Sequence, residues 1–410
     1  MDYNSKMNTD LLNNKSREGC RALLTYSSYY DATTASKRVL DASKSLFSEI
    51  KILYWARIGN TQESDDAIYE GIEKVAYTKV APSRSFRVLL QFIKFQFWVF
   101  KNIRSYKPDF IHAFYLYTII PCLLYKYIFN RKCVVLYDPR DYVAVCYNVP
   151  KIVSWLIMWI DSICIKLADY VIFPDKQYFT YYGKLKLKES KYLIIPNSLE
   201  DSYEKVVTED VYSKYNISKE KLIIPLLGYF SETRGKTLFY EIIKLKPEGF
   251  HFIIAGYFRD KEDIDFFRCQ SNVTYLGTVS YWDALAIMKD SAIVPLLYDP
   301  VLLNNKHAYP TKFYDSLMVG VPVLVSYGQV DVYEDIMKYN LGLGIKYNDL
   351  EGFQEVLELL KTRPYHEERF RLRKLYLEKY DFDIFRDKLR QTYIKLIGPA
   401  KSMDKRNSIN

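Results

Sequence analysis

The sequence predicts an α/β protein with two parallel-sheet domains that face each other across a cleft. Short β-type runs alternate with helical patterns along the chain, which is typical of parallel sheets covered by helices on both faces. The chain has 410 residues, of which 49% are hydrophobic, so two cores of ordinary size are expected. A turn-forming cluster at 194–198 and a polar stretch to Ser218 separate two similar series of strands.

Each series contains six expected strands. In the first half these are residues 20–26, 50–55, 110–113, 133–137, 170–173 and 192–195. In the second half they are residues 222–227, 252–255, 273–276, 292–295, 321–325 and 342–345. We therefore expect an N-terminal domain at 19–200, a second domain at 219–380, and a helix at 381–398 that packs back on the first domain. The carboxyl ends of both sheets should open onto the cleft.

Several protein classes are disfavoured by composition. Met1–Glu18 is polar and has no apolar core of a signal peptide, so we expect the chain to stay in the cytoplasm. The six cysteines and four histidines have no paired spacing, which argues against a structural zinc site or a serine triad. The apolar stretch 152–168 contains two charges and is too short to span a bilayer, so it is expected to be a buried helix.

The excess positive charge lies in the first half of the chain. Segment 74–137 carries eleven basic residues and one acidic residue, Asp109. Nucleic acid, an anionic membrane or a phosphorylated substrate would each suit such a segment. Bulky apolar residues at 86–100 surround the charges, which favours an anionic membrane surface over nucleic acid. A helix that packs its apolar side and solvates its charges is the alternative.

The strongest local signal lies in residues 304–324. It predicts a polar loop, a helix that begins near Pro310 or Thr311, a helix end at Gly320 and a buried strand from Val321. Backbone N–H groups just beyond such a proline, with the positive end of the helix dipole, suit a diphosphate.

Two charged residues follow in this helix. Lys312 places a cation in the first turn, where the helix dipole disfavours it, so the side chain makes more sense facing an anion. Asp315 lies one turn further on, where its carboxylate could accept hydrogen bonds from ribose hydroxyls.

This stretch resembles the donor-binding signature of the retaining family 4 glycosyltransferases, a Pro-x-Lys-x-x-Glu helix start followed by a small residue, Gly and Pro-Val. It also resembles, more narrowly, the members that build bacterial capsule and lipopolysaccharide chains, in which an Asn-rich loop precedes the proline. The resemblance covers roughly residues 20 to 395 and implies the GT-B fold of two facing Rossmann-like domains, with the donor held by the C-terminal half. The donor-binding residues that it implies are Gly228, Lys236, Thr278, His307, Tyr309, Pro310, Thr311 and Asp315.

The second half departs from the family pattern in two places. His307 stands where the family often has a first Glu, and Asp315 replaces the second. Tyr229 replaces the basic residue that usually follows the glycine turn. The positive charge at the diphosphate therefore falls to Arg234, with Lys236 as a second candidate.

On the acceptor side, the family's Gly-Gly pair is replaced by Ser27-Ser28-Tyr29-Tyr30. Tyr29 and Tyr30 would suit an acceptor or a sugar ring, although packing in a turn explains them nearly as well. His112 matches the family's Asp-x-x-His-x pattern at a strand end, where a structural role is the more common one.

Two carboxylates follow the strand that ends at Tyr137. Asp138 and Asp141 point into the predicted cleft, and some capsule-building relatives carry a similar Asp-x-x-Asp pattern. They either contact sugar hydroxyls and belong to the catalytic set, or cap the next helix.

The resemblance implies transfer of a hexose-type sugar, with retention, from a nucleotide-sugar donor to a lipid-linked or polysaccharide acceptor in bacterial surface polysaccharide synthesis. Arg234, Lys312 and backbone N–H groups at 309–312 would stabilise the departing diphosphate, so neither a metal nor another cofactor is expected. The protein would then lie peripherally on the inner face of the cell membrane.

Two other functions remain open. A catalytically silent partner would bind the nucleotide sugar only, and a GT-B epimerase would need a general acid/base pair near the sugar. The cations at positions 234, 236 and 312 argue against the silent partner, and the basic aromatic segment 74–137 argues against a soluble epimerase.

Overall fold

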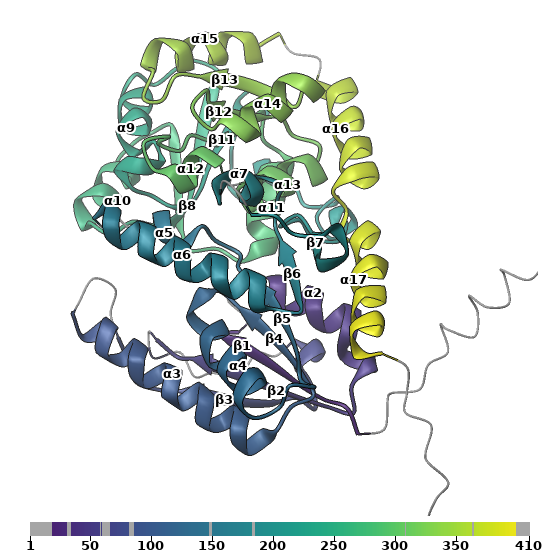
Figure 1. Cartoon of the computed structure of the whole chain (residues 1–410). Coiled ribbons are helices and arrows are strands. Elements are labelled where there is room, and N and C mark those ends of the chain that lie inside the picture. Colours follow the sequence, from purple (N-terminus) through teal and green to yellow (C-terminus); the bar gives the residue numbers. More distant parts are fainter. Residues whose placement is uncertain are drawn as a thin grey trace, which may run out of the picture. The chain divides into compact units, whose positions relative to one another are not determined.

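The computed structural model describes residues 19–30, 34–57, 59, 66–81, 86–146, 150–182, 185–307, 309–362 and 365–398 (Figure 1). Met1–Glu18 and Arg84 of the basic segment lie outside these ranges. The chain forms two compact units. Unit 1 contains the chain up to Ile195 and again from Phe385, and unit 2 is Pro196–Ile384.

Unit 1 is built on a seven-stranded, wholly parallel sheet with the order β3-β2-β1-β4-β5-β6-β7. Its strands are β1 (Arg21–Tyr26), β2 (Glu49–Trp55), β3 (Glu73–Tyr77), β4 (Phe110–Phe114), β5 (Val134–Asp138), β6 (Tyr170–Phe173) and β7 (Tyr192–Ile194). The central strand β4, with sequence FIHAF, is buried at all five positions, as expected for a parallel strand covered on both faces. The strand order reverses between β1 and β4, which makes this the topological switch point of the sheet.

All six strands expected in the first half are present. A seventh strand, β3, was not predicted from the sequence. β3 has the sequence EKVAY and pairs only with β2, at the edge of the sheet. An edge strand needs little apolar character, since one of its sides meets solvent. Its alternation of charged and small residues therefore gave no clear β signal.

Helices connect the strands of unit 1. They are α2 (Thr34–Ser43), α3 (Phe86–Tyr106), α4 (Leu116–Ile128), α5 (Val143–Cys146), α6 (Lys151–Leu167) and α7 (Gln177–Tyr181). The prediction that the stretch 152–168 is a buried helix is wrong for one of its faces: Trp155 and Trp159 of α6 are 57% and 52% exposed. Among the described helices, none is both long and apolar enough to cross a membrane.

The C-terminal helix α17 (Phe382–Ile397) belongs mostly to unit 1 (Figure 1). The Arg386 guanidinium forms an ion pair with Asp41 of α2. The buried Tyr393 ring packs against Phe47 and Phe110. The end of the chain thus completes the core around β4.

Unit 2 contains two three-stranded parallel sheets, β10-β9-β8 and β11-β12-β13. The strands are β8 (Leu222–Tyr229), β9 (Phe250–Tyr257), β10 (Val273–Gly277), β11 (Val294–Leu296), β12 (Val323–Ser326) and β13 (Gly342–Ile345), as expected from the sequence to within a few residues. A parallel bridge between Ile223 and Ser291 joins the two sheets. The combined order, third-second-first-fourth-fifth-sixth, is that of a dinucleotide-binding Rossmann sheet, with its switch point between β8 and β11.

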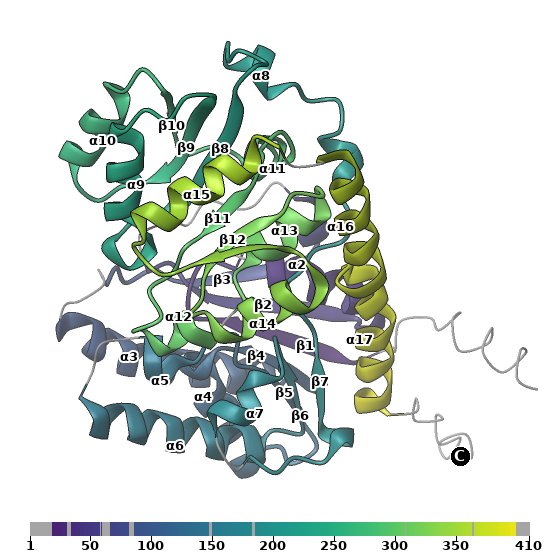
Figure 2. The ribbon, with the colours of Figure 1, turned by 90° about the horizontal axis from the view of Figure 1, so that it is seen from above.

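The helices of unit 2 form two layers. They are α8 (Val211–Lys214), α9 (Lys236–Lys244), α10 (Lys261–Arg268), α11 (Tyr281–Lys289), α12 (Leu303–His307), α13 (Thr311–Met318), α14 (Val330–Tyr339), α15 (Leu350–Leu360) and α16 (Tyr365–Lys379). One core joins the sheet to α9, α10 and α15, and the other joins it to α11, α13 and α16 (Figure 2). Alternate residues of β9 enter the two cores: Ile253 and Ala255 enter one, and Phe252 and Ile254 enter the other.

The ends of β8 and β9 approach each other unusually closely. Gly228 pairs with Gly256, and a Cβ atom added to Gly256 would lie 1.8 Å from the Gly228 carbonyl oxygen. Only glycine fits this position without moving the backbone of β8.

We predict that Gly256→Ala lowers the free energy of unfolding by about 2 kcal/mol or more, since the backbone of β8 must shift. Gly249→Ala is the control, because Gly249 also has a positive φ (+83°) but no atom lies within 4 Å of its added Cβ. That change should cost about 1 kcal/mol through backbone strain alone. Denaturant unfolding followed by circular dichroism measures both, and equal losses would contradict the packing argument.

Candidate active site

Arg234 lies at the switch point of unit 2. It ends the 3₁₀ turn Glu232–Arg234 that follows β8, and its guanidinium carbon lies 4.5 Å from the centre of the Tyr298 ring, which follows β11. The turn is fixed on both sides. The Asp299 N–H donates to the Thr233 carbonyl at 3.0 Å, and the Gly235 N–H donates to the Tyr347 hydroxyl at 3.1 Å. A half-buried cation is thus held where Rossmann sheets bind their ligands.

Lys312 lies beside the same segment of chain. Pro310 precedes α13 in an extended conformation, and Lys312 is the second residue of the helix. Its ammonium donates a hydrogen bond to the Leu227 carbonyl near the end of β8. A Cβ atom on Gly228, whose φ is +101°, would lie 3.1 Å from this ammonium. Gly228, the last but one residue of β8, therefore has a lysine directly over it and the start of a helix next to it.

Lys236 has other partners. Its ammonium lies 3.0 Å from Asp263 and 3.2 Å from Glu232. Burial lowers the pKa of Lys236, but the hydrogen bonds to these carboxylates outweigh burial and raise it. The charge of Lys236 is thus balanced inside unit 2, which leaves Arg234 and Lys312 as the better placed pair of cations.

Asp315 holds two segments together. Its carboxyl group is buried and accepts a hydrogen bond from the Tyr281 hydroxyl at 3.0 Å. Tyr281 begins α11, three residues after the exposed Thr278 that follows β10. Burial raises the pKa of Asp315 to about 7, against the lowering effects of the Tyr281 hydrogen bond and the Lys312 charge. In this structure Asp315 therefore links α13 to the loop after β10 instead of presenting its carboxylate at the surface.

His307 and Tyr309 attach the chain before α13 to α14. The His307 Nδ1 lies 2.8 Å from an Asp331 carboxylate oxygen. The Tyr309 hydroxyl donates to the Asp331 carbonyl and to the Asp335 carboxylate, at 3.0 and 2.9 Å. The predicted polar loop before Pro310 contains the short helix α12, which is a correction to the sequence interpretation. Pro310 is half-buried and Thr311 exposed.

Unit 1 contains a buried polar cluster on the central strands of its sheet. His112 on β4 and Asp138 at the end of β5 are both almost fully buried, with 3.6 Å between His112 Nε2 and an Asp138 carboxylate oxygen. Arg140 approaches the same oxygen to 2.9 Å, and the Tyr393 hydroxyl lies 2.5 Å from His112 Nδ1. Burial raises the pKa of Asp138, but Arg140 and then His112 outweigh it and hold the pKa below its ordinary value. Burial lowers the pKa of His112, so the ring is neutral at pH 7 while Asp138 is charged.

The remaining first-half candidates differ in exposure. Asp141 is exposed, whereas Asp138 faces its buried partners. Tyr30 is fully buried and packs against Tyr54, while Tyr29 is half-buried against both rings. In this conformation a ligand could touch Asp141 and Tyr29, but not their buried neighbours Asp138 and Tyr30.

Sequence reasoning missed four contributors to these clusters. They are Tyr281, Tyr298, Arg140 and Tyr393. Arg140 carries a signal in retrospect, because it lies between two aspartates, and its φ of +60° is uncommon for a residue with a side chain. Tyr393 has none, because it is 281 residues away from His112 in the chain. Among the described residues, no three His, Cys, Asp or Glu side chains gather as metal ligands would.

Comparison with known proteins gave matches only to solved structures; no family model and no curated sequence matches the chain. Sucrose-phosphate synthase from Thermosynechococcus elongatus aligns with a TM-score of 0.72 at 12% identity, over 92% of this chain and 99% of that one. HepE from Anabaena, solved with UDP-glucose, aligns with a TM-score of 0.61 at 13% identity, over 91% and 99%. The chain has the GT-B fold. WaaG, a glycosyltransferase involved in lipopolysaccharide biosynthesis, has the same fold and aligns with a TM-score of 0.61 at 13% identity, over 90% and 98%.

In the GT-B fold of this chain, unit 2 is the Rossmann-like domain that contains Arg234 and Lys312, and unit 1 contains the His112–Asp138 cluster. The seven-stranded sheet of unit 1 and the ordered strands of unit 2 agree with the α/β prediction. At 10 to 15% identity the likeness establishes the fold, and the site must be argued from its own geometry.

The buried Asp315 predicts a specific pH dependence of stability. Because its folded pKa of about 7 lies above the unfolded value of about 4, the folded state holds this proton more tightly. The protonated carboxyl group makes its full contribution to stability below about pH 4. As the pH rises to 7, up to about 4 kcal/mol of the free energy of unfolding is lost. Asp315→Asn should therefore lose less stability than the wild type between pH 5 and pH 8 in denaturant unfolding. Parallel pH profiles for the two proteins would contradict the raised pKa.

Proposed function

We propose that this protein is a glycosyltransferase that binds a nucleotide-sugar donor in unit 2 and transfers its sugar, of the hexose type, with retention. The observation that carries the proposal is the placement of two cations at the switch point of the Rossmann-ordered sheet. Lys312 lies over Gly228 of β8, and Arg234 lies in the turn that follows β8. GT-B neighbours that are glycosyltransferases, one of them solved with UDP-glucose, support the same reaction class.

The proposed catalysis is electrostatic. When the bond between the sugar and the diphosphate breaks, negative charge grows on the leaving diphosphate. Arg234, Lys312 and the first backbone N–H groups of α13 would stabilise that charge, and they are held in place before the reaction begins. The guanidinium is fixed against Tyr298 and its turn is tied to Tyr347, so little reorganisation is needed. This scheme needs no metal ion.

Unit 1 supplies the acceptor side in this proposal. Asp141 would contact sugar hydroxyls, and Tyr29 would stack on an acceptor ring. Asp138 would act as a positioning residue, because its buried contact with Arg140 fixes the loop that leads to Asp141. The acceptor is a lipid-linked or polysaccharide chain of the bacterial surface, the setting in which WaaG also acts.

The basic segment 74–137 would hold unit 1 on the inner face of the cell membrane. Its exposed side chains include Lys94, Lys101, Arg104, Arg131 and Lys132. Each basic residue near an anionic lipid surface contributes roughly 1 kcal/mol, so a few of them suffice for peripheral binding.

A donor screen tests the proposal. Purified protein is incubated with UDP-, GDP- and ADP-sugars, with and without membrane lipid extract, while nucleotide release is followed. We expect lipid-dependent release from one donor. Arg234→Ala and Lys312→Ala should each lower kcat by about 10²- to 10³-fold, since each removes a charge that faces the leaving group. Lys244→Ala, which removes an exposed lysine of α9 in the same unit, should leave the rate unchanged.

Two results of that screen would contradict the transferase. If a donor binds but is not consumed under any condition, the chain is a silent nucleotide-sugar-binding partner. If the sugar is isomerised while the nucleotide stays attached, the chain is an epimerase on the same fold.

A further inference from the structure

Helix α6 carries an exposed apolar stripe. Ile152, Trp155, Leu156 and Trp159 follow one another at helical spacing, and each is between 46% and 76% exposed. Their spacing of three and four residues puts them on one face of the helix. The opposite face is held by Asp161, which is buried and accepts hydrogen bonds from Tyr137 and Tyr182. The rotation of α6 is thus fixed, with both tryptophans directed outward.

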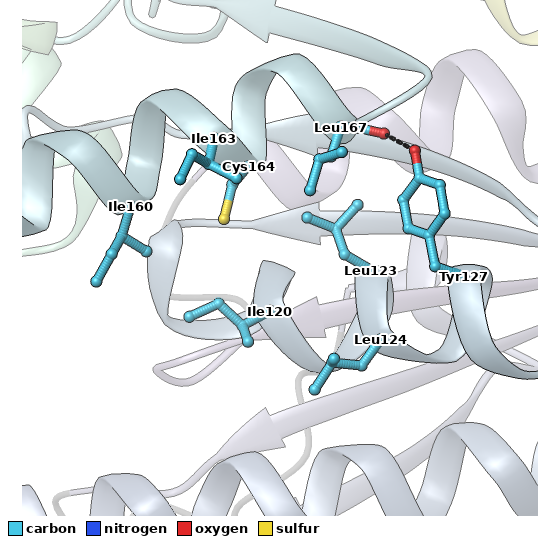
Figure 3. A pocket seen from close by; sticks show the side chains of 8 residues that line it. All are labelled: Ile120, Leu123, Leu124, Tyr127, Ile160, Ile163, Cys164 and Leu167. Carbon is cyan, nitrogen blue, oxygen red and sulfur yellow. Dashed lines mark hydrogen bonds between the residues drawn. The ribbon is translucent and has the colours of Figure 1, made fainter.

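An apolar groove of about 400 Å³ lies between α6 and α4. Figure 3 shows the side chains of the two helices directed toward each other across it. The groove is lined by Ile120, Leu123, Leu124, Tyr127, Ile160, Ile163, Cys164 and Leu167. Leu123 and Cys164 are buried, whereas Leu124 and Leu167 are exposed at its rim. The Tyr127 hydroxyl donates to the Leu167 carbonyl at 2.9 Å, which fixes α4 to the end of α6.

The apolar surface continues across α4 to α3. Ile128 and Phe129 are exposed at the end of α4, and Leu90, Ile93 and Phe97 are exposed on α3. Helix α4 contacts both α3 and α6, so the three helices form one layer (Figure 1). Exposed apolar residues spread over three adjacent helices form a surface that ordinarily marks a binding site.

The charges on these three helices have almost one sign. Residues 90–107, 116–132 and 150–167 contain one carboxylate, the buried Asp161. Lys151 and Lys166 lie at the two ends of α6, and Arg131 and Lys132 follow α4; all four are exposed. Exposed tryptophans flanked by lysine and arginine, with no exposed carboxylate among them, fit the boundary between the headgroups and acyl chains of an anionic bilayer.

We propose that α4 and α6 insert into one leaflet of an anionic phospholipid bilayer, with a phospholipid acyl chain in the groove between them. Trp155 and Trp159 lie at the headgroup boundary, and the basic residues at the helix ends contact lipid phosphates. This inference rests on the membrane association in the proposed function, but not on the transferase reaction. The proposed function invokes only electrostatic docking through the basic segment. Here hydrophobic insertion is added, and it involves α6, which lies outside that segment.

Vesicle binding with tryptophan variants tests the inference. Full-length protein is sedimented with vesicles of phosphatidylglycerol and phosphatidylcholine, or of phosphatidylcholine alone. We expect Trp155→Ser/Trp159→Ser to weaken binding to the anionic vesicles at least tenfold. Trp282→Ser is the matched control, because Trp282 is 42% exposed on unit 2, and it should bind like the wild type. Circular dichroism and donor binding should be unchanged in both variants.

Bromine-labelled acyl chains report insertion directly. They should quench the tryptophan emission of the wild type. The quenching should fall sharply in the double variant, which keeps only the buried Trp55, the half-buried Trp98 of α3 and Trp282 of unit 2. Leu124→Glu, which places a carboxylate at the rim of the groove, should also weaken binding. If wild-type protein does not bind anionic vesicles, docking and insertion are both wrong.

Two results would overturn insertion alone. In the first, the double variant and the Leu124→Glu variant bind anionic vesicles as well as the wild type does, and the brominated chains do not quench the wild type. The second is a wild-type dimer that the tryptophan substitutions convert to monomers, because a second copy would then cover this surface. Vesicle binding is measured without a donor, so each of these outcomes can be read even if the donor screen finds no transferase reaction.

Discussion

The glycine pair Gly228 and Gly256, at the ends of β8 and β9, is the constraint on which the site in unit 2 depends. Without a side chain at Gly228, the Lys312 ammonium can reach the Leu227 carbonyl and lie over the turn. Without one at Gly256, the neighbouring strand can run close enough to keep β8 in register to its end. A larger residue at either position would displace the strand, the lysine, or both. An exposed backbone at Gly228 with a cation beside it is also the setting that the proposed function gives to the donor diphosphate.

Much of the fold could be predicted from the sequence, because parallel strands and their helices leave periodic apolar patterns. The edge strand β3 could not, since half of its surface meets solvent. Arg234 and Lys312 were found from local signals, a glycine turn and a proline at a helix start. The partners of Lys236 and Asp315 could not be predicted. Asp263 is 27 residues from Lys236 and Tyr281 is 34 residues from Asp315, and no local pattern indicates these contacts. Hydropathy also failed for α6, since an apolar side chain that is exposed looks the same in a sequence as one that faces a core.

The buried cluster of unit 1 joins parts of the chain that are far apart. His112 and Asp138 come from adjacent strands, Arg140 from the next loop and Tyr393 from the C-terminal helix. Buried charges are costly unless they are paired, and hydrophobic residues would fill the same space with less risk to stability. Arg140 also has a positive φ, a strain that proteins tend to keep where it serves a function. The cluster therefore fits a role in placing the loop at 138–141, and it makes the C-terminal helix part of that role.

The distribution of charge matches the two binding tasks of the proposed function. Residues 201–410 contain 30 basic and 30 acidic residues, whereas residues 1–200 contain 28 and 19. A diphosphate needs only a few fixed cations, and residues 201–410 provide Arg234 and Lys312 without any net excess of positive charge. A membrane is an extended anionic surface, so it requires many cations spread over several elements, which is how they occur on α3, α4 and α6 of unit 1. In the proposed function the excess of positive charge lies on the acceptor side, and a soluble acceptor would leave both this excess and the exposed tryptophans of α6 unexplained.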